Sequence, residues 1–233
     1  MSSMNLSSGS VMIDWSLRPR PLRESLVGCW CTLMPLDPQR HAVELHDAFA
    51  RDESGAGWTY LSYGPFADAE AYAAWMRANA LGADPQFFAV VERASGRALG
   101  LVAYLRIEPA HGAIEIGHIH WSLEMRRTPV ATEAIFLLLD RAFVLGYRRV
   151  EWKCDALNVP SRAAAARFGF QFEGVFRQHM VVKGRNRDTA WFAILDHAWP
   201  ALRASYVRWL AAENFDAQGR QKLRLTDFSG QGE

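Results

Sequence analysis

Apolar residues recur along this chain with two periods, one typical of helices and one typical of strands. The clearest helical pattern has its apolar members at intervals of three and four: Ile135, Leu138, Leu139, Ala142 and Leu145. Thr128 stands at a favoured N-cap position, Pro129 suits the first helical turn, and Gly146 suits a left-handed residue after the last turn. The pattern therefore predicts a helix that begins after Thr128 and ends before Gly146.

The same two periods predict the other elements. Further helices are expected after a cap at Asp37, around Tyr72 to Asn79, in a short segment through Ala166, and along a stripe that ends at Leu210. Strands are expected at residues 29–36, on both sides of a turn at 94–96, at 113–123, in "RRVEWKCDA", and in "FGFQFEGVFRQHMVV" and "DTAWFAILD". This order predicts an α+β fold, with a mainly antiparallel twisted sheet, one or two parallel crossings, and flanking helices.

One domain is expected, over residues 29–212. Residues 1–28 begin "MSSMNLSSGSVMIDWS", with no basic n-region and no apolar run long enough for a signal peptide, so they are interpreted as a flexible N-terminal arm. Residues 213–233 are interpreted as a peripheral C-terminal tail. The apolar run at 134–139 is stopped by two charged residues and is far too short to span a membrane.

Composition narrows the class of protein. The 26 basic and 25 acidic residues nearly cancel, so no global field favours nucleic acid or an anionic membrane as a partner. Half of the residues are hydrophobic, enough for a substantial core. Cys29, Cys31 and Cys154 lack the spacing of a metal site, which favours reduced, packed thiols in a cytosolic protein and no metal.

Arg126 and Arg127 directly precede the N-terminus of the predicted long helix. A cap accounts for Thr128 and Pro129, but it does not account for two cations beside a helix end that already carries partial positive charge. Such an end attracts anions. A bound phosphate would resolve this conflict.

Two segments resemble the GNAT superfamily of acyl-CoA-dependent N-acetyltransferases. The stretch Arg126 to Ala131, continued by Thr132, Glu133 and Ala134, is similar to the pyrophosphate loop of that family, with Pro129 in place of its central glycine. The stretch "NVPSRAAAARFGFQFEG" is similar to the family's Asn-x-x-Ser segment with its Gly-Phe-x-x-Glu-Gly ending, and Asp188, "FAILD" and Trp199 add a weaker match. The resemblance covers about Cys29 to Leu210 and is strongest to the branch that includes ribosomal-protein alanine N-acetyltransferases.

The resemblance implies a GNAT-like fold in which a splayed strand pair holds acyl-CoA, with acetyl-CoA as co-substrate. The coenzyme-binding residues that it implies are Trp121, Arg126, Arg127, Thr128, Val130, Ala131, Thr132, Asn158 and Ser161. Asn158 also suits a helix N-cap and Ser161 an exposed first-turn position. Many members carry a tyrosine seven residues after the Asn158 position as an acid for the leaving thiolate, whereas this chain has Ala165.

Acetyl transfer to an amine needs a group that takes a proton from the ammonium ion. The position of Glu115, eleven residues before Arg126, resembles that of the glutamate base in some GNAT enzymes. In a regular strand Glu115 shares one face with Gly117, Ile119 and Trp121, while His118 and His120 share the other face. Glu115 also suits a salt-bridged structural role, and either histidine is a competing base if it points into the cleft.

The acceptor is expected beside the aromatic stretch that follows Gly55. Trp58, Tyr60 and Tyr63 are the candidate substrate-binding residues, since aromatic faces favour cationic ligands, although core packing explains them equally well. A peptide or protein α-amine suits the branch, and a small amine suits the superfamily. Pro129 and Ala165 keep a non-catalytic acyl-CoA-binding regulatory module as the alternative, and homodimer formation is left open.

Overall fold

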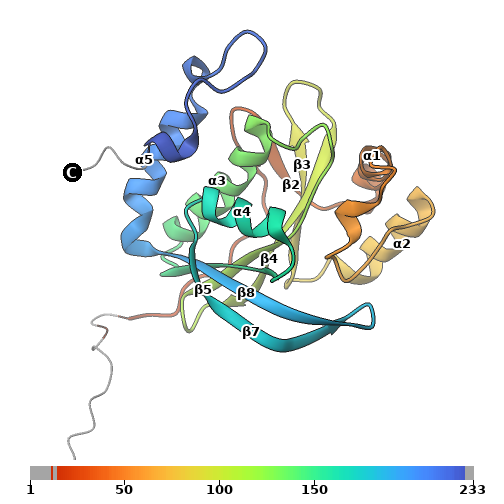
Figure 1. The fold of residues 1–233 in the computed structure, drawn as a ribbon, viewed down its shortest axis with the longest axis horizontal. Coiled ribbons are helices and arrows are strands. Elements are labelled where there is room, and N and C mark those ends of the chain that lie inside the picture. Colours follow the sequence, from red (N-terminus) through yellow and green to blue (C-terminus); the bar gives the residue numbers. More distant parts are fainter. Residues whose placement is uncertain (1–11, 13–14, 229–233) are drawn as a thin grey trace, which may run out of the picture.

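The computed structural model describes residue 12 and residues 15–228, and within these the strands form one eight-stranded sheet (Figure 1). The strands are β1 (Leu26–Val27), β2 (Cys31–Pro35), β3 (Gln86–Glu92), β4 (Ala98–Glu108), β5 (Ala113–Trp121), β6 (Arg149–Asp155), β7 (Gln171–Val182) and β8 (Arg185–Leu195). The α-helices are α1 (Pro38–Ala50), α2 (Ala69–Asn79), α3 (Pro129–Val144), α4 (Val159–Arg167) and α5 (Trp199–Leu210). Short 3₁₀ turns lie at Ala56–Trp58, Asp196–Ala198, Ala212–Asn214 and Leu225–Phe228.

The strand order β1-β2-β3-β4-β5-β6-β8-β7 is antiparallel at every pair except β5–β6. This confirms the predicted α+β architecture with one parallel crossing, which α3 makes. Helices α1 and α2 cover one side of the sheet, and α3, α4 and α5 lie on the other side (Figure 1). Among the described residues, no helix combines the length and the apolar character that crossing a membrane requires.

The sheet has a hydrophobic core on each face. Successive residues of a strand point to opposite faces, and β4 shows this directly. Leu101 and Ala103 pack in the core beneath α1 and α2, whereas Val102 and Tyr104 pack in the core beneath α3. The near-continuous burial of β4 is therefore the result of two covered faces.

Helix α3 has the predicted ends, with one difference at its start. Gly146 has a φ of 82°, the left-handed conformation that glycine adopts without strain. Thr128 is the N-cap residue, but its hydroxyl donates to the carbonyl of Met125 at 2.7 Å and does not cap the helix. The backbone N–H groups of the first turn of α3 therefore have no side-chain cap.

Strands β5 and β6 part soon after they meet. Their register runs only from Ala113↔Arg149 to Glu115↔Glu151. Beyond Glu115, the β4–β5 register changes from Ala103↔Gly117 to Leu101↔His120, which places an extra residue in β5 and forms a bulge. A φ of 52° at His118 marks this bulge. The splayed strand pair expected from the resemblance is present.

The N-terminal segment differs from the free arm expected for residues 1–28, of which 1–11 and 13–14 lie outside the described residues. From Trp15 onward this segment is attached to the domain: the Trp15 indole donates to Ala110, and the Arg23 guanidinium donates to the carbonyl of Leu81. Strand β1 then pairs with β2, which places Leu26 opposite Leu33. The local sequence of this segment has no regular apolar pattern, so it did not predict these long-range contacts.

The C-terminal tail predicted at 213–233 is packed against the domain as far as it is described. Phe215 and Leu225 are buried, and the Trp209 indole donates to the Gln221 side chain at 3.0 Å. The Asn214 side chain is also buried and joins the tail to α5, because it donates to the carbonyl of Trp209 and accepts from the backbone N–H of Leu223. Residues 213–228 are therefore part of the folded domain and not peripheral to it.

Glu133 joins α3 to the start of the sheet. Its buried carboxylate accepts hydrogen bonds from the backbone N–H groups of Cys29, Trp30 and Cys31, at 2.7 to 2.8 Å. A Cβ at Gly28 would lie 2.3 Å from Glu133 Oε2, so only glycine lets the chain pass this closely. One side chain thus satisfies three backbone donors that would otherwise be buried without partners.

Replacing Glu133 with glutamine should lower the free energy of unfolding by about 1.5 to 3 kcal/mol, because one carboxylate oxygen is replaced by an NH₂ group, which cannot accept a hydrogen bond. Urea denaturation measures the change. Glu53→Gln, on the exposed segment after α1, is the control and should remain within about 0.5 kcal/mol of the original protein. Equal stability of the two variants would contradict this role for Glu133.

Candidate active site between the parted strands

A cavity of about 1190 Å³ occupies the gap where β5 and β6 separate. Its walls come from both strands, the loop 56–62, the start of α3, one side of α4 and the β7–β8 hairpin. Of the coenzyme-binding residues predicted from the sequence, all but one line it: Trp121, Arg126, Arg127, Thr128, Ala131, Thr132, Asn158 and Ser161. The exception is Val130, whose side chain is buried in the hydrophobic core.

The two arginines before α3 have different environments. Arg126 donates from Nε to the carbonyl of Trp121 and pairs through Nη2 with Asp52 at 3.1 Å. A hydrogen bond from Ser54 and the contact with Arg126 hold the pKa of Asp52 below its ordinary value. Arg127 has a φ of 64° and no ion pair within the described part of the chain. Asp52 therefore resolves part of the charge conflict predicted at this helix end, and Arg127 keeps its charge available for an anion.

Helix α4 supplies the wall opposite α3. The Asn158 side chain accepts from the backbone N–H of Ser161 at 3.1 Å, so Asn158 is an N-cap residue. The Ser161 hydroxyl accepts from the Trp152 indole at 3.0 Å. Both residues thus have a structural partner while they line the cavity, and their contact with a coenzyme stays a prediction. Ala165 is fully buried and offers no acid.

Arg167, also on α4, is a site residue that the sequence patterns did not single out. Its Nη1 donates to the Thr132 hydroxyl at 3.1 Å, and its guanidinium lies over the rings of Phe168 and Trp209. Burial lowers the pKa of Arg167, and within the described residues no carboxylate pairs with it. A half-buried cation beside the uncapped end of α3 favours an anionic ligand.

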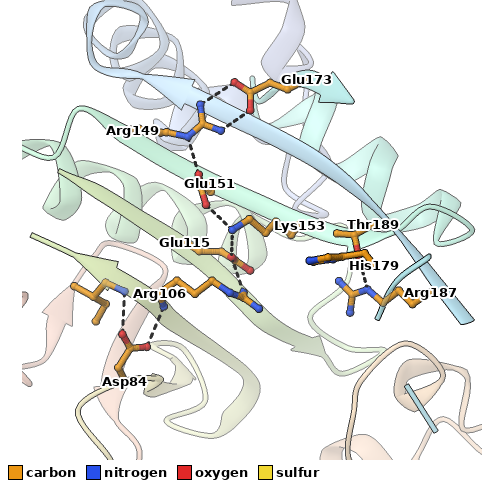
Figure 2. Close-up of polar contacts among 11 residues, drawn as sticks. Asp84, Arg106, Glu115, Arg149, Glu151, Lys153, Glu173, His179, Arg187 and Thr189 are labelled. Atoms are coloured by element: carbon orange, nitrogen blue, oxygen red, sulfur yellow. Dashed lines mark hydrogen bonds and ion pairs between the residues drawn. The ribbon is translucent and has the colours of Figure 1, made fainter. Parts of the chain in front are cut away.

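Glu115 lies at the point where the strands part, in a chain of ion pairs that runs through both of them (Figure 2). Its buried Oε2 accepts from Arg106 Nη1 at 2.7 Å and from Lys153 Nζ at 3.0 Å. Lys153 also binds Glu151 at 2.6 Å and lies 3.8 Å from the centre of the Trp191 ring. The predicted salt-bridged role is therefore present, in a residue that also lines the cavity.

The neighbouring ion pairs fix the geometry of this group. Asp84 accepts from the backbone N–H groups of Arg106 and Ile107, at 3.0 and 2.9 Å, and so anchors the irregular turn of β4 that carries Arg106. At the far end Arg149 binds both Glu151 and Glu173. Although burial opposes it, hydrogen bonding from Lys153 and Arg149 holds the pKa of Glu151 below its usual value.

His118 and His120 share a face, as strand alternation predicted, because both rings pack against aromatic residues of the core beneath α1 and α2. Ile116 and Ile119 both pack in the core beneath α3, so the bulge breaks the alternation between these two residues. Every residue from Glu115 to Trp121 lines the cavity. Burial and the nearby Arg106 lower the pKa of His118 to about 4, and burial and Arg126 lower that of His120 to about 3. Both imidazoles are therefore neutral at pH 7 and accept protons more weakly than an ordinary histidine.

The predicted aromatic acceptor wall is only partly present. Trp58 is buried and packs edge-on against Phe49 and His120, while Tyr63 stacks on Trp75, so both belong to the core that carries α1 and α2. Tyr60 does line the cavity, and its hydroxyl donates to the carbonyl of Leu157, just before α4, at 3.1 Å. Trp58 and Tyr63 do not line the cavity, because the Gly-rich loop that carries them folds inward and completes the core.

The cysteines only partly match the packed thiols predicted. All three are free thiols; Cys31 and Cys154 are buried, and burial raises the pKa of each. Cys29 is exposed, because its backbone is drawn to Glu133 while its side chain points outward.

A mixed sheet whose parallel pair opens at the uncapped start of a helix is the arrangement that the resemblance to acyl-CoA-dependent N-acetyltransferases predicted, and such a helix end can bind phosphates. The family model described as "Acetyltransferase (GNAT) domain" matches residues 31–171. The chain belongs to this GNAT acetyltransferase family, which confirms the superfamily resemblance. The assignment to the ribosomal-protein branch stays a prediction.

Proteins of known structure are similar over nearly the whole chain. A GCN5-related N-acetyltransferase from Brucella melitensis is 49% identical, with a TM-score of 0.91, over 94% of this chain and 99% of that one. A probable GNAT-family acetyltransferase from Chromobacterium violaceum is 46% identical, with a TM-score of 0.78, over 86% and 100%. The uncharacterized N-acetyltransferase p20 of Bacillus licheniformis is 29% identical over 113 residues, which are 46% of this chain and 61% of that protein.

The lowered pKa of His120 makes stability depend on pH. The unfolded chain binds a proton at this residue below about pH 6.5, whereas the folded chain does so only near pH 3. Stability should therefore be fully present above pH 6.5 and should fall as the pH is lowered, by about 1.4 kcal/mol per pH unit for one proton. His120→Gln should remove this part of the slope between pH 6 and 4, measured by urea denaturation.

His197→Gln is the matched control for this experiment, since His197 is exposed on the surface. Its slope should equal that of the original protein. A His120→Gln variant with an unchanged slope would show that His120 titrates normally in the folded state.

Proposed function

We propose that this protein transfers an acetyl group from acetyl-CoA directly to a primary amine within one ternary complex. The observation that carries the proposal is the uncapped N-terminus of α3 opening into the cavity between the parted strands. Thiol release from acetyl-CoA in the presence of peptides or small amines tests it.

The α3 end has the donors that a pyrophosphate needs. Backbone N–H groups of its first turn lack a side-chain cap, since the Thr128 hydroxyl is engaged by Met125. Arg127 and Arg167 add cationic donors from two sides, and charge-assisted hydrogen bonds of this kind are among the stronger polar contacts. The pantetheine arm would then run between β5 and β6, toward Glu115.

The transfer itself requires a free amine. The amine nitrogen forms a bond to the acetyl carbon, the carbon–sulfur bond breaks, and CoA leaves as a thiolate that takes up a proton. The ammonium proton must first go to a base, and Glu115 is the proposed one because its carboxylate lies in the cavity where the strands part. Arg106 and Lys153 both bind Oε2, which fixes the side chain and leaves Oε1 toward the acceptor.

Much of the acceleration would come from placement. Holding amine and thioester in register contributes on the order of 7 to 11 kcal/mol in well-oriented systems. The bulge at His118 interrupts the ladder with β4, so it can present backbone N–H groups to the thioester carbonyl, where charge develops. With Ala165 at the position of the family's tyrosine, the thiolate would take its proton from water or from another side chain.

The acceptor is proposed to be a peptide or protein α-amine or a small amine. A non-catalytic acyl-CoA-binding regulatory module is the second candidate, and the buried Ala165 is the observation that favours it. Binding of acetyl-CoA without thiol release with any amine would select the second candidate. Failure of millimolar acetyl-CoA to raise the melting temperature would contradict both, because a ligand that binds only the folded state must stabilise it.

Glu115→Gln should lower kcat by roughly 10²- to 10⁴-fold, the usual contribution of a general base, with little change in coenzyme affinity. Glu151→Gln is the matched control: it weakens the same Lys153 ion pair but leaves the carboxylate that lines the cavity. Kinetics across pH and calorimetry with CoA measure the two quantities. If both variants lose activity equally, the ion-pair network acts structurally and Glu115 is not the base.

Pro129→Gly should tighten acetyl-CoA binding severalfold and slightly lower the melting temperature of the free protein. The substitution restores a backbone N–H for the pyrophosphate, worth roughly 1.5 to 3 kcal/mol, against ~0.4 to 1 kcal/mol for the freed chain. Pro38→Gly, at the same position of α1, is the control and should lower the melting temperature without changing affinity. Weaker coenzyme binding by Pro129→Gly would place the phosphates elsewhere.

A further inference from the structure

The β7–β8 hairpin carries a cation that the proposed coenzyme site does not use. Arg187 of β8 lines the cavity, and its Nε donates to the Thr189 hydroxyl at 3.2 Å. Within the described residues, its two terminal nitrogens make no hydrogen bond and no carboxylate pairs with it. A half-buried guanidinium without a counter-charge can take an anion from a ligand.

The position of Arg187 is built into the hairpin. Thr189 is buried, and its hydroxyl also contacts His179 Nδ1 at 2.9 Å (Figure 2). His179 is placed there by a register shift in β7, where Gln178 has a φ of 50° and donates to Asp188. Two strands therefore fix the stem of the arginine, and its head faces the cavity.

The other cations on this wall already have partners. Arg106 and Lys153 share the carboxylate of Glu115, and Lys153 also binds Glu151. Asp155, the other acidic residue of the lining, accepts from the backbone N–H of Leu157. Arg187 is thus the cation of this wall whose charge is left for a ligand.

The hairpin that forms this wall reaches the loop after Gly55, where the acceptor is expected. The hairpin runs beneath α4 toward the layer of α1 and α2 (Figure 1). At its tip, Lys183 Nζ donates to the carbonyls of Trp58 and Gly64, at 3.0 and 2.9 Å. Arg187 therefore comes from a different element from the phosphate-binding candidates, since Arg127 precedes α3 and Arg167 ends α4.

Given the proposed acetyl transfer, we propose that the acceptor is a peptide with an acidic side chain near its N-terminus, and that Arg187 binds that carboxylate. The register sets the distance. Glu115 pairs with Glu151, whereas Thr189, which anchors Arg187, pairs with Asp155, four residues farther along β6. At ~3.3 Å per strand residue this separation exceeds the span of one free amino acid. An α-amine near Glu115 and a carboxylate on a following residue fit it.

The experiment compares matched peptides that differ only in Glu, Gln or Lys at the second or third position, with alanine or serine first. The original protein should acetylate the Glu peptides with a kcat/KM on the order of tenfold above the Gln peptides, expressed mainly in KM, as expected for one charge-assisted contact. Arg187→Gln should erase this preference and leave CoA affinity unchanged. Raising the salt concentration should reduce the preference in the original protein.

Arg185→Gln is the matched control, because Arg185 lies two residues away on β8, is exposed, and does not line the cavity. It should keep the preference. Equal turnover of Glu and Gln peptides by the original protein, equal slowing of both by Arg187→Gln, or weaker CoA binding by that variant would each overturn the proposal. Thiol release without a preference for acidic peptides would contradict this inference alone. Absence of thiol release with every amine tested would contradict both the proposed function and this inference.

Discussion

The structure depends on a parallel strand pair that stays together for only three residues of each strand, Ala113–Glu115 and Arg149–Glu151. A sheet normally closes such a gap by continuing its hydrogen bonds, since unpaired backbone groups are costly when buried. Here the bulge at His118 turns β5 away, and β6 continues with β8 as its partner. Where the hydrogen bonding between β5 and β6 ends, the two strands line a cavity, and the candidate site residues lie around it.

Helix α3 must be held firmly for its N-terminus to serve as an anion site. Glu133, in its second turn, accepts from three consecutive backbone N–H groups that end at the first residue of β2, so one buried carboxylate joins the helix to the sheet. The opposite wall of the cavity is formed by α4, and it is held to β6 by the hydrogen bond from the Trp152 indole to the Ser161 hydroxyl. Glu133 and Ser161, which both lie in segments that resemble the GNAT family, therefore also hold the walls of the cavity in place.

The sequence predicted regular elements well because local periodicity sets them: α3, the 94–96 hairpin and the β7–β8 pair all agree with it. It could not predict features that arise from long-range pairing. Trp58 and Tyr63 look the same in sequence whether they line a pocket or fill a core, and the irregular φ at His118 follows from the β4–β5 register. Arg167 and Arg187 have no motif; only the fold shows that they line the cavity and pair with no carboxylate among residues 15–228.

Some charged side chains in the cleft are paired with a side chain of opposite charge, and others are not. The chain from Arg106 through Glu115 and Lys153 to Glu151 alternates in sign, so its members neutralise one another and stay ordered in a buried position. Such a network fixes the positions of its side chains more than it attracts a charged ligand. Arg127, Arg167 and Arg187 line the same cavity and pair with no carboxylate in the described part of the chain, so a net attraction for ligands would come from them. An anionic coenzyme and an acidic acceptor would then be drawn to different arginines of one cavity, and the neutral network would leave the amine free of competing charge.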